Sequence, residues 1–323
     1  MKSILLTGAT GFVGSAVRPR LAASGWHVRC LTRDAARARA AAPGFAWVQG
    51  DVNEEAACTA ALRGCQAALY LVHGIGTDAH YQEHEVAAAE KFACAAGEAG
   101  LERIVYLGGV APQGEGSEHL RSRLAVGEAL RAGPVKTIEL RASMIVGHDS
   151  LSWLIVRDLA ARLPAMILPA WLKSRTEPVA IDDVLVALLA ALTLEVQASA
   201  WFDVPGPEVL SGREILEQTS RVMDLPPAAI FEVPLLTPRL SSLWVHLVSR
   251  ARWSVAREVV LGLTEDLLAH DDHFWQLIGH PRRLRFTEAA QRALDAERRE
   301  QPIPGVWGAV ERARTYLKHH PAA

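Results

Sequence analysis

The chain has 323 residues, of which 50% are hydrophobic and 22% are charged. This balance is typical of a folded globular protein and argues against a disordered one. Its 34 lysines and arginines nearly cancel its 36 aspartates and glutamates, for a formal net charge of -2. A nucleic-acid partner would need a concentrated basic face, so we expect none.

Targeting and membrane-spanning signals are not expected in this sequence. The N-terminus MKSILLTGATG leads directly into a structured motif, so we expect no signal peptide. The longest uncharged apolar run, residues 184–194, is shorter than the ~20 residues that a bilayer requires. The cysteines show no metal-ligand spacing and lie in apolar surroundings, which favours buried, reduced thiols. We therefore expect a soluble cytoplasmic protein; peripheral membrane contact and oligomerisation stay open.

The first half of the chain alternates between short apolar runs and Ala-rich segments with helical spacing. The apolar runs predict six strands: SILLTG, WHVRCLT, FAWVQG, AALYLVHG, RIVYLGG and TIELRASMIVG. The segments between them predict helices at residues 11–24, 34–42, 54–63, 78–99 and 118–132. Continuous apolar strands separated by amphipathic helices are typical of a parallel sheet covered on both faces. The predicted fold class is α/β, a doubly wound parallel sheet, with residues 1–148 as a dinucleotide-binding domain.

The second half has a mostly helical pattern. Helices are predicted at residues 150–162, 182–197, 211–222 and 237–262, and short runs at 178–181 and 201–204 are expected to return to the sheet. We interpret residues 149–323 as a smaller, mostly helical substrate lobe. The Arg- and Glu-rich tail beyond Pro281 is expected to form a solvated helix.

The strongest functional signal is TGATGFVG at residues 7–14, between the first predicted strand and the first predicted helix. In this position Gly8 permits a tight turn, Gly11 lets the backbone approach a diphosphate, and Gly14 lets helix and strand pack closely. The free amides and the helix dipole favour the negative charge. We predict a dinucleotide held by Gly8, Thr10, Gly11, Phe12, Val13 and Gly14.

The end of the second strand distinguishes NAD from NADP. An acidic residue there would bind the ribose 2′-hydroxyl, whereas this sequence has Thr32 and Arg33. A guanidinium pairs with a 2′-phosphate, so we favour NADP(H), although Arg33 on the surface beside a helix start is the alternative. Asp34 resembles the N-cap of the next helix. Asp51 and Val52 after the third strand are predicted to bind the cofactor, with Asp51 accepting from the adenine amino group; the alternative for Asp51 is a helix cap.

The motifs TGATGFVG, LTRD and GDVNE together resemble the short-chain dehydrogenase/reductase superfamily in its extended and atypical branches. The stretches YLVHGIG, IVYLGGV, HLRSRLAVGEALR, ELRASMIVG and LTPRLSSLWVHLV resemble more narrowly the YbjT-like atypical group, relatives of NmrA-like proteins. The resemblance covers residues 1–295. It implies a Rossmann core that binds NAD(P), and an oxidoreductase or epimerase-like activity on an unidentified small molecule.

The sequence departs from the catalytic pattern that this resemblance implies. The superfamily has a Tyr-x-x-x-Lys pair on the helix after the fifth strand and a hydroxyl residue at the end of that strand. Here the strand ends in Gly108 and Gly109, and the helix offers His119-Leu-Arg-Ser-Arg123. Three interpretations stay open: Arg123 clamps the cofactor ribose beside an uninvolved His119, both form an acid pair, or both are solvated with no role.

The remaining strand ends supply further candidates. By the resemblance, Val72 and His73 after the fourth strand and Ala142, Ser143 and Met144 after the sixth lie near the nicotinamide. For the substrate pocket we predict a set of polar and aromatic residues, although each is also compatible with a structural role: His73, Ile145, His148, Trp153 and Arg175. The histidines and aspartates of AHDDHFW (269–275) lack a metal-binding frame, so we expect no metal.

Two functions follow from these observations. The first is an atypical oxidoreductase that uses NADP(H) to transform a small molecule. The second is a non-catalytic NADP(H)-binding sensor, regulator or assembly protein, which the missing tyrosine and hydroxyl favour.

Overall fold

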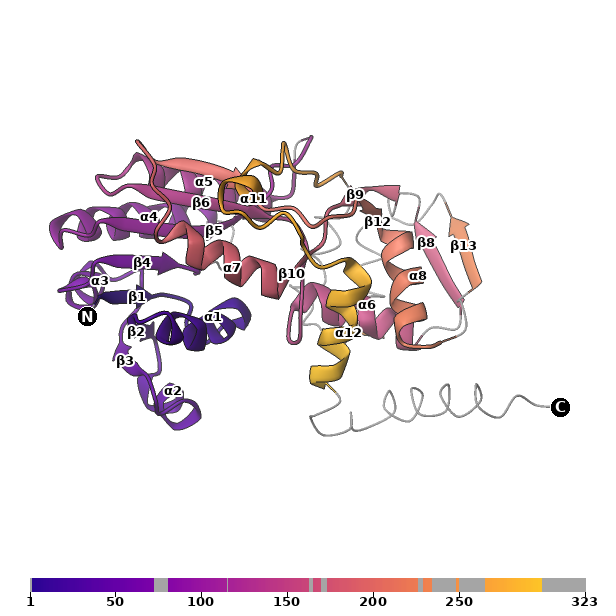
Figure 1. Ribbon diagram of the computed structural model, residues 1–323, viewed down its shortest axis with the longest axis horizontal. Coiled ribbons are helices and arrows are strands. Elements are labelled where there is room, and N and C mark those ends of the chain that lie inside the picture. Colours follow the sequence, from indigo (N-terminus) through magenta and orange to yellow (C-terminus); the bar gives the residue numbers. More distant parts are fainter. Residues whose placement is uncertain are drawn as a thin grey trace.

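The computed structural model describes residues 2–72, 81–114, 116–162, 165–169, 173–225, 229–233, 248–249 and 265–297. A sheet covered by helices occupies one end of the molecule, and a smaller group of helices and short strands occupies the other (Figure 1). Within these ranges no helix is both long and apolar enough to cross a membrane.

Seven parallel strands form the main sheet, in the order β11-β6-β5-β4-β1-β2-β3. Their bounds are β1 (Ser3–Leu6), β2 (His27–Thr32), β3 (Ala46–Gln49), β4 (Ala67–Tyr70), β5 (Arg103–Gly109), β6 (Thr137–Ala142) and β11 (Ala200–Asp203). The order reverses between β1 and β4, and ligands of such sheets bind outside the carboxyl ends of the strands at this point. The predicted doubly wound fold is confirmed.

Helices cover both faces of this sheet (Figure 1). One face carries α1 (Phe12–Ala23), α2 (Ala35–Ala41) and α7 (Ile181–Ala191), and the other carries α3 (Glu55–Leu62), α4 (Tyr81–Glu98) and α5 (Glu118–Ala132). The side chains of Ile4 and Leu6 belong to the first hydrophobic core and that of Leu5 to the second. Both faces of β1 are therefore buried, which is why its sequence is continuously apolar.

The second lobe packs around α6 (Leu151–Arg162), α8 (Gly212–Val222) and α12 (Phe286–Glu297). Three two-stranded sheets accompany these helices. They pair β7 (Ile145–Val146) with β10 (Val179–Ala180), β9 (Arg175–Thr176) with β12 (Leu210–Ser211), and β8 (Ala165–Pro169) with β13 (Ala229–Val233). The short helix α11 (His273–Leu277) returns to the main core through Phe274 and Trp275.

Several expectations for the second half need correction. The run at 201–204 does rejoin the main sheet as β11, but the run at 178–181 pairs with β7 instead. The helix beyond Pro281 is not merely solvated, because one face of α12 is buried against α6 and α8: Phe286, Ala289, Ala290, Ala293 and Leu294. The helix predicted at 237–262 falls almost wholly outside the described residues. The division at residue 148 stays a prediction.

The four cysteines do not share one environment. Cys30, Cys58 and Cys65 are buried, and burial raises the pKa of each thiol. Cys94 is exposed on α4, so the expectation that all four thiols are buried is wrong for that residue.

Candidate functional site

The glycine-rich turn between β1 and α1 has room only for glycine at two positions. Gly8 has a φ of +62°, and a methyl group there would lie 2.6 Å from the carbonyl oxygen of Leu71. A methyl group at Gly14 would lie 2.2 Å from the carbonyl oxygen of Gly8. Both distances are far below van der Waals contact, so the turn depends on these residues having no side chain.

The same turn presents backbone amides to an open face. Thr10 and Gly11 are exposed, and Gly11 is the N-cap of α1 without a side-chain hydrogen bond at the cap. The first amides of a helix have no partner inside it and, with the helix dipole, attract an anion. The amide of Gly11 donates to the Gly8 carbonyl at 3.0 Å within the turn, so the amides of Thr10, Phe12 and Val13 are the candidates to hold the diphosphate of a dinucleotide.

The predicted cofactor residues meet at the carboxyl edge of the sheet. Gly8 lies against Leu71 at the end of β4, directly before Val72. A methyl group at Gly147 would lie 2.9 Å from the Phe12 ring, so the segment after β6 reaches the start of α1. The amide of Val110 donates to the carbonyl of Ala142 at 3.3 Å, which joins the ends of β5 and β6. His73 falls outside the described residues.

The end of β2 presents Arg33 to solvent. Its side chain is exposed, and its carbonyl accepts a hydrogen bond from Gln49 Nε2 at 2.7 Å. The prediction that Asp34 caps the next helix is confirmed, since its carboxylate accepts from the Arg37 amide at 2.9 Å. Asp34 is thus occupied by the helix, and Arg33 is the charged side chain free to face a cofactor.

Asp51 folds back on its own loop. Its Oδ1 accepts from the amide of Asn53 at 3.0 Å and from the side-chain nitrogen of Asn53 at 2.7 Å. The N-cap of α3 is Glu54, so Asp51 is not that helix cap. The neighbouring Val52 has a side chain that is buried in the core. The turn holds the Asp51 carboxylate in one place without burying it completely.

Helix α5 carries His119 and Arg123 to the end of β5. Ser117 caps the helix by accepting from the Leu120 amide at 3.3 Å. A methyl group at Gly109 would lie 3.3 Å from Arg123 Cδ and 3.6 Å from its Nη1. Gly109 therefore leaves the space in which the Arg123 side chain lies, whereas a methyl group at Gly108 would meet Tyr106 and Glu139.

The environment of this pair is largely dehydrated. Burial, and then the positive charge of Arg123, lower the pKa of His119 to about 3, so its ring is neutral at pH 7. Burial also lowers the pKa of Arg123, against the opposing effects of Tyr106 and Glu85. The Nε of Arg123 is buried and makes no hydrogen bond within the described part of the chain. This burial argues against the solvated-pair interpretation.

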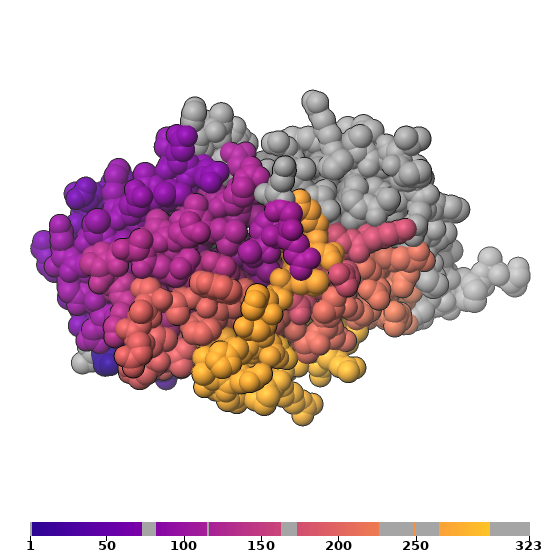
Figure 2. Space-filling model, turned by 90° about the horizontal axis from the view of Figure 1, so that it is seen from above, coloured from indigo at the N-terminus to yellow at the C-terminus, as the bar shows by residue number. Residues whose placement is uncertain are grey.

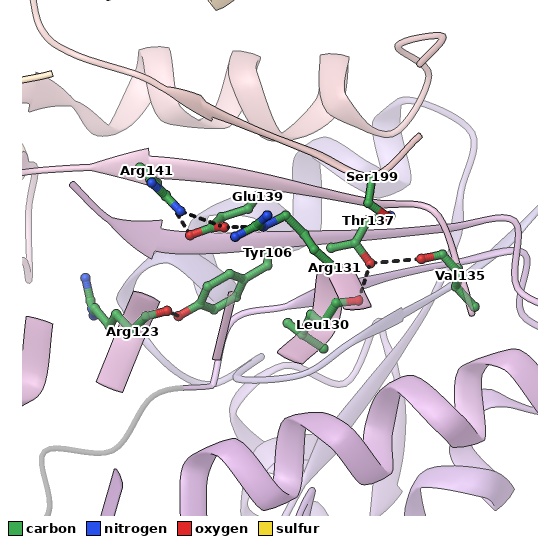
Figure 3. Close-up of polar contacts among 9 residues, drawn as sticks. All are labelled: Tyr106, Arg123, Leu130, Arg131, Val135, Thr137, Glu139, Arg141 and Ser199. Carbon is green, nitrogen blue, oxygen red and sulfur yellow. Dashed lines mark hydrogen bonds and ion pairs between the residues drawn. The ribbon is translucent and has the colours of Figure 1, made fainter. Parts of the chain in front are cut away.

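Further along α5 from His119 and Arg123, a buried ion cluster joins the helix to β6 (Figure 3). Glu139 on β6 has no exposed surface and accepts from Arg131 Nε and Arg141 Nε, both at 2.8 Å. A methyl group at Gly127 would lie 2.4 Å from the Glu139 carboxylate, so the helix packs directly on the ion cluster. Four residues spaced four positions apart lie along one side of α5: His119, Arg123, Gly127 and Arg131.

The sequence alone did not predict this ion cluster or the Tyr106 ring beside it. Tyr106 on β5 is buried, and its hydroxyl donates to the Arg123 carbonyl at 3.1 Å (Figure 3). Burial raises its pKa, which makes it a poor proton donor. The signal available in the sequence was the pair Glu139 and Arg141, two opposite charges on the same side of an otherwise apolar strand.

The segment after β6 is held by backbone contacts. Ser143 Oγ donates to the carbonyl of Glu177 at 2.8 Å, and the Met144 carbonyl accepts from the Val179 amide at 2.9 Å. Ile145 is half-buried on β7. These contacts leave the backbone of 142–146 at the strand ends, where the resemblance predicts it.

Two residues predicted for the substrate pocket have structural roles. Trp153 is only 1% exposed and packs edge-to-face on Phe286 in the core of the second lobe, which favours the structural role over a pocket wall. Arg175 pairs with Asp266 through its Nη2 at 2.7 Å, and its place in the substrate pocket stays a prediction. His148 is half-buried and lies 3.2 Å from the carboxylate of Asp149, so it stays a candidate.

The acidic and histidine-rich segment at 269–275 organises its own backbone. Asp271 accepts from the His273 amide at 3.0 Å, and Asp272 accepts from Arg283 Nη2 at 3.1 Å. In the described ranges, no group of three or more histidine, cysteine or acidic residues is arranged to hold a metal ion.

The family of this chain follows from its similarity to known proteins. Residues 8–161 match the family described as NAD(P)H-binding. A relative from Streptomyces griseus subsp. griseus, (4-alkanoyl-5-oxo-2,5-dihydrofuran-3-yl)methyl phosphate reductase, is 33% identical over 232 residues, which are 69% of this chain and 74% of the relative. The chain belongs to the atypical short-chain dehydrogenase/reductase family. As a member of this family it binds NAD(P)(H), and the glycine turn fits that cofactor.

Solved structures support the same fold. The triphenylmethane reductase of Citrobacter sp. complexed with NADP(H) superposes with a TM-score of 0.70 at 18% identity, covering 90% of this chain and 99% of that one. MoeE5 in complex with UDP-glucuronic acid and NAD gives a TM-score of 0.69 at 18% identity, covering 92% and 99%. At these identities the structures establish the shared fold alone.

Proposed function

We propose that this protein is an NADPH-dependent reductase of a small molecule with a polarised carbonyl group or a double bond conjugated to one. The observation that carries the proposal is the place of Arg123, whose guanidinium packs against Gly109 at the end of β5. A relative that covers most of the chain is named as a reductase, which supports reduction over epimerisation. The substrate in that relative's name is a phosphate ester, and an anionic substrate would suit the half-buried guanidinium of Arg123.

The bound nicotinamide would supply the hydride, and the protein would supply position and charge. Reduction of a carbonyl moves negative charge onto its oxygen, and a fixed cation in a dehydrated site stabilises that charge. Arg123 would either provide this stabilisation or donate to the ribose hydroxyls, since its planar group suits both. His119 is neutral, so it would donate one hydrogen bond but would not act as an imidazolium acid. Water or the substrate would supply the proton.

The second candidate is a protein that binds NADP(H) without turnover. The specific observation in its favour is that β5 ends in Gly108 and Gly109, so the hydroxyl that orients a substrate in the superfamily has no equivalent there. Tyr106 does not replace the missing tyrosine, because its hydroxyl is used by the Arg123 carbonyl.

Replacing Arg123 with methionine is expected to lower kcat about 100-fold, because the site loses its fixed cation. His119→Asn is expected to change kcat less than about fivefold, since the amide can still donate a hydrogen bond. The measurement is NADPH oxidation with ketones, quinones, sugar nucleotides and unsaturated lactone phosphates. The wild-type rate should show no ionisation of His119 near pH 6.5, because the pKa of His119 is lowered to about 3.

The control for these variants is Arg213→Met on α8, which removes an exposed cation from an i,i+4 pair with Glu217. Equal losses for His119→Asn and Arg123→Met would favour the acid pair instead. Tight NADPH binding without turnover of any compound would favour the sensor.

Preference for NADPH is proposed to depend on Arg33. Arg33→Ala should weaken NADPH binding about tenfold and leave NADH binding within about twofold, because only NADPH has the 2′-phosphate that pairs with a guanidinium. Calorimetric titration of both cofactors checks this. Arg37→Ala, on the exposed first turn of α2, is the matched control. Equal losses for the two cofactors would show that Arg33 does not bind the 2′-phosphate.

We also propose a reducing cellular compartment, the cytoplasm, for this enzyme. The support is chemical: all four cysteines are free thiols, and three of them are buried in the core of the sheet domain.

A further inference from the structure

Residues 265–270, here called the strap, connect several parts of the site. The segment is far from the glycine turn in sequence, yet it contacts the loop before α5, strand β9 with the Glu177 that follows it, and the end of β11. Figure 2 shows the yellow C-terminal chain on this face, against the magenta chain of the first half and the salmon chain of the second.

One end of the strap binds the loop that precedes α5. Glu265 Oε2 accepts from the amides of Gly114 at 3.1 Å and Gly116 at 3.2 Å. A methyl group at position 114 would lie 2.8 Å from that oxygen, and Gly116 has a φ of +68°, so both glycines are needed for this approach. Ser117, the N-cap of α5, follows immediately. Hydrogen bonds from amides to a carboxylate are strong, so the loop is held where the helix begins.

The other end of the strap is attached to β9 and β11. The backbone amide of Arg175 donates to Asp266 at 2.6 Å, in addition to the ion pair between their side chains. The amide of Ala269 donates to Glu177 Oε2 at 2.5 Å, and the amide of His270 donates to Asp203 Oδ2 at 2.6 Å.

One of these residues, Glu177, also contacts the proposed nicotinamide region. The carbonyl of Glu177 accepts from Ser143 Oγ, in the segment after β6. Burial raises the pKa of Glu177 and of Asp203, and the amide hydrogen bonds from the strap oppose that shift. The strap therefore joins the loop before α5 to the segment after β6, the two sides between which a substrate would lie.

We propose that the strap is a positioning element of the reductase site, in which Glu265 holds Gly114 and Gly116, before the N-cap Ser117, so that α5 presents Arg123 at the end of β5. This role rests on the proposed function, because it concerns the rate of that reaction. Glu265 is a positioning residue and not a catalytic one, since its carboxylate contacts backbone amides of the loop. A loop displaced by about 1 Å at this point is sufficient to slow a reaction that depends on orientation.

The test uses Glu265→Ala and Glu265→Gln in the full chain, with two measurements. Hydrogen exchange of the amides at 111–117, measured without cofactor, should accelerate about tenfold in Glu265→Ala, and less in Glu265→Gln, which keeps one acceptor oxygen. With NADPH, kcat should fall about tenfold in Glu265→Ala and partly recover in Glu265→Gln, while the calorimetric Kd for NADPH stays within about twofold.

The matched control is Glu208→Ala. Glu208 is also half-buried and its Oε2 also accepts from a backbone amide, that of Phe286 at 2.8 Å, but in the second lobe. It should leave both the exchange at 111–117 and kcat unchanged. Equal effects of the Glu208 and Glu265 substitutions would overturn the proposal, because the loss would then be general.

The proposal and the proposed function fail in separate measurements. Unchanged exchange at 111–117 in Glu265→Ala would show that the carboxylate does not hold the loop. Faster exchange with an unchanged kcat would show that the position of the loop does not matter for the reaction. A wild-type protein without turnover would refute the reductase and the strap's role in the rate. The exchange experiment would still show whether Glu265 holds the loop before α5.

Discussion

Gly14→Ala is expected to weaken NADPH binding by at least about 100-fold, or about 2.7 kcal/mol. The added methyl group would lie 2.2 Å from the carbonyl oxygen of Gly8 and 2.9 Å from Ala9 Cα. These are backbone atoms, so the conflict can be relieved only by moving α1 away from the turn. The amides of the first helical turn would then no longer converge on the diphosphate.

Calorimetric titration with NADPH measures this effect, and circular dichroism shows whether the variant is folded. Gly44→Ala is the matched control, because Gly44 is exposed, has no positive φ and has no atom within 4 Å of an added methyl group. Binding by a folded Gly14→Ala protein at wild-type affinity would contradict the assignment of the turn to the cofactor.

Glu139→Gln is expected to lower the free energy of unfolding by about 3–5 kcal/mol. Within the described residues, this carboxylate is the ion-pair partner of both Arg131 and Arg141. Removal of its charge leaves two guanidinium groups close together beneath α5, with the Arg141 group also stacked 4.3 Å from the centre of the Trp201 ring. Breaking a buried ion pair is costly because the remaining charges stay dehydrated.

Urea unfolding of the two proteins gives this difference directly. The control is Glu217→Gln, which breaks an exposed i,i+4 pair with Arg213 and should cost about 0.3–0.5 kcal/mol. A loss below about 1 kcal/mol for Glu139→Gln would mean that another carboxylate neutralises the arginines, and Asp203 is a candidate because the charge of Arg141 acts to lower its pKa.

The sequence predicts the sheet half of this molecule well because its signals are local. The apolar run at 3–6 and the glycine turn after it define β1 and the start of α1 from neighbouring residues alone. The position of Arg123 at the end of β5 also follows from an alternation of elements and a resemblance. These features do not require knowledge of which distant segments meet.

The missed features all depend on partners far apart in the chain. The ion pair of Arg175 with Asp266 has no local signal, because the two residues are 91 positions apart. The packing of Trp153 on Phe286 has none either, because nothing near Trp153 in the sequence shows that Phe286 covers it. Glu265 had no local signal, since a carboxylate that binds the amides of a remote glycine loop resembles any surface acid.

The path of the chain between the two parts of the molecule limits how they can move. It leaves the main sheet for α6, returns through β10 to α7 and β11, crosses again to β12 and α8, and comes back through α11 before ending the described chain in α12. A hinge that opens like a clamshell needs few connections between two bodies, and this chain has many. We therefore expect cofactor and substrate to enter through small rearrangements of the loops around the site. The two parts of the molecule would keep a nearly constant orientation to each other.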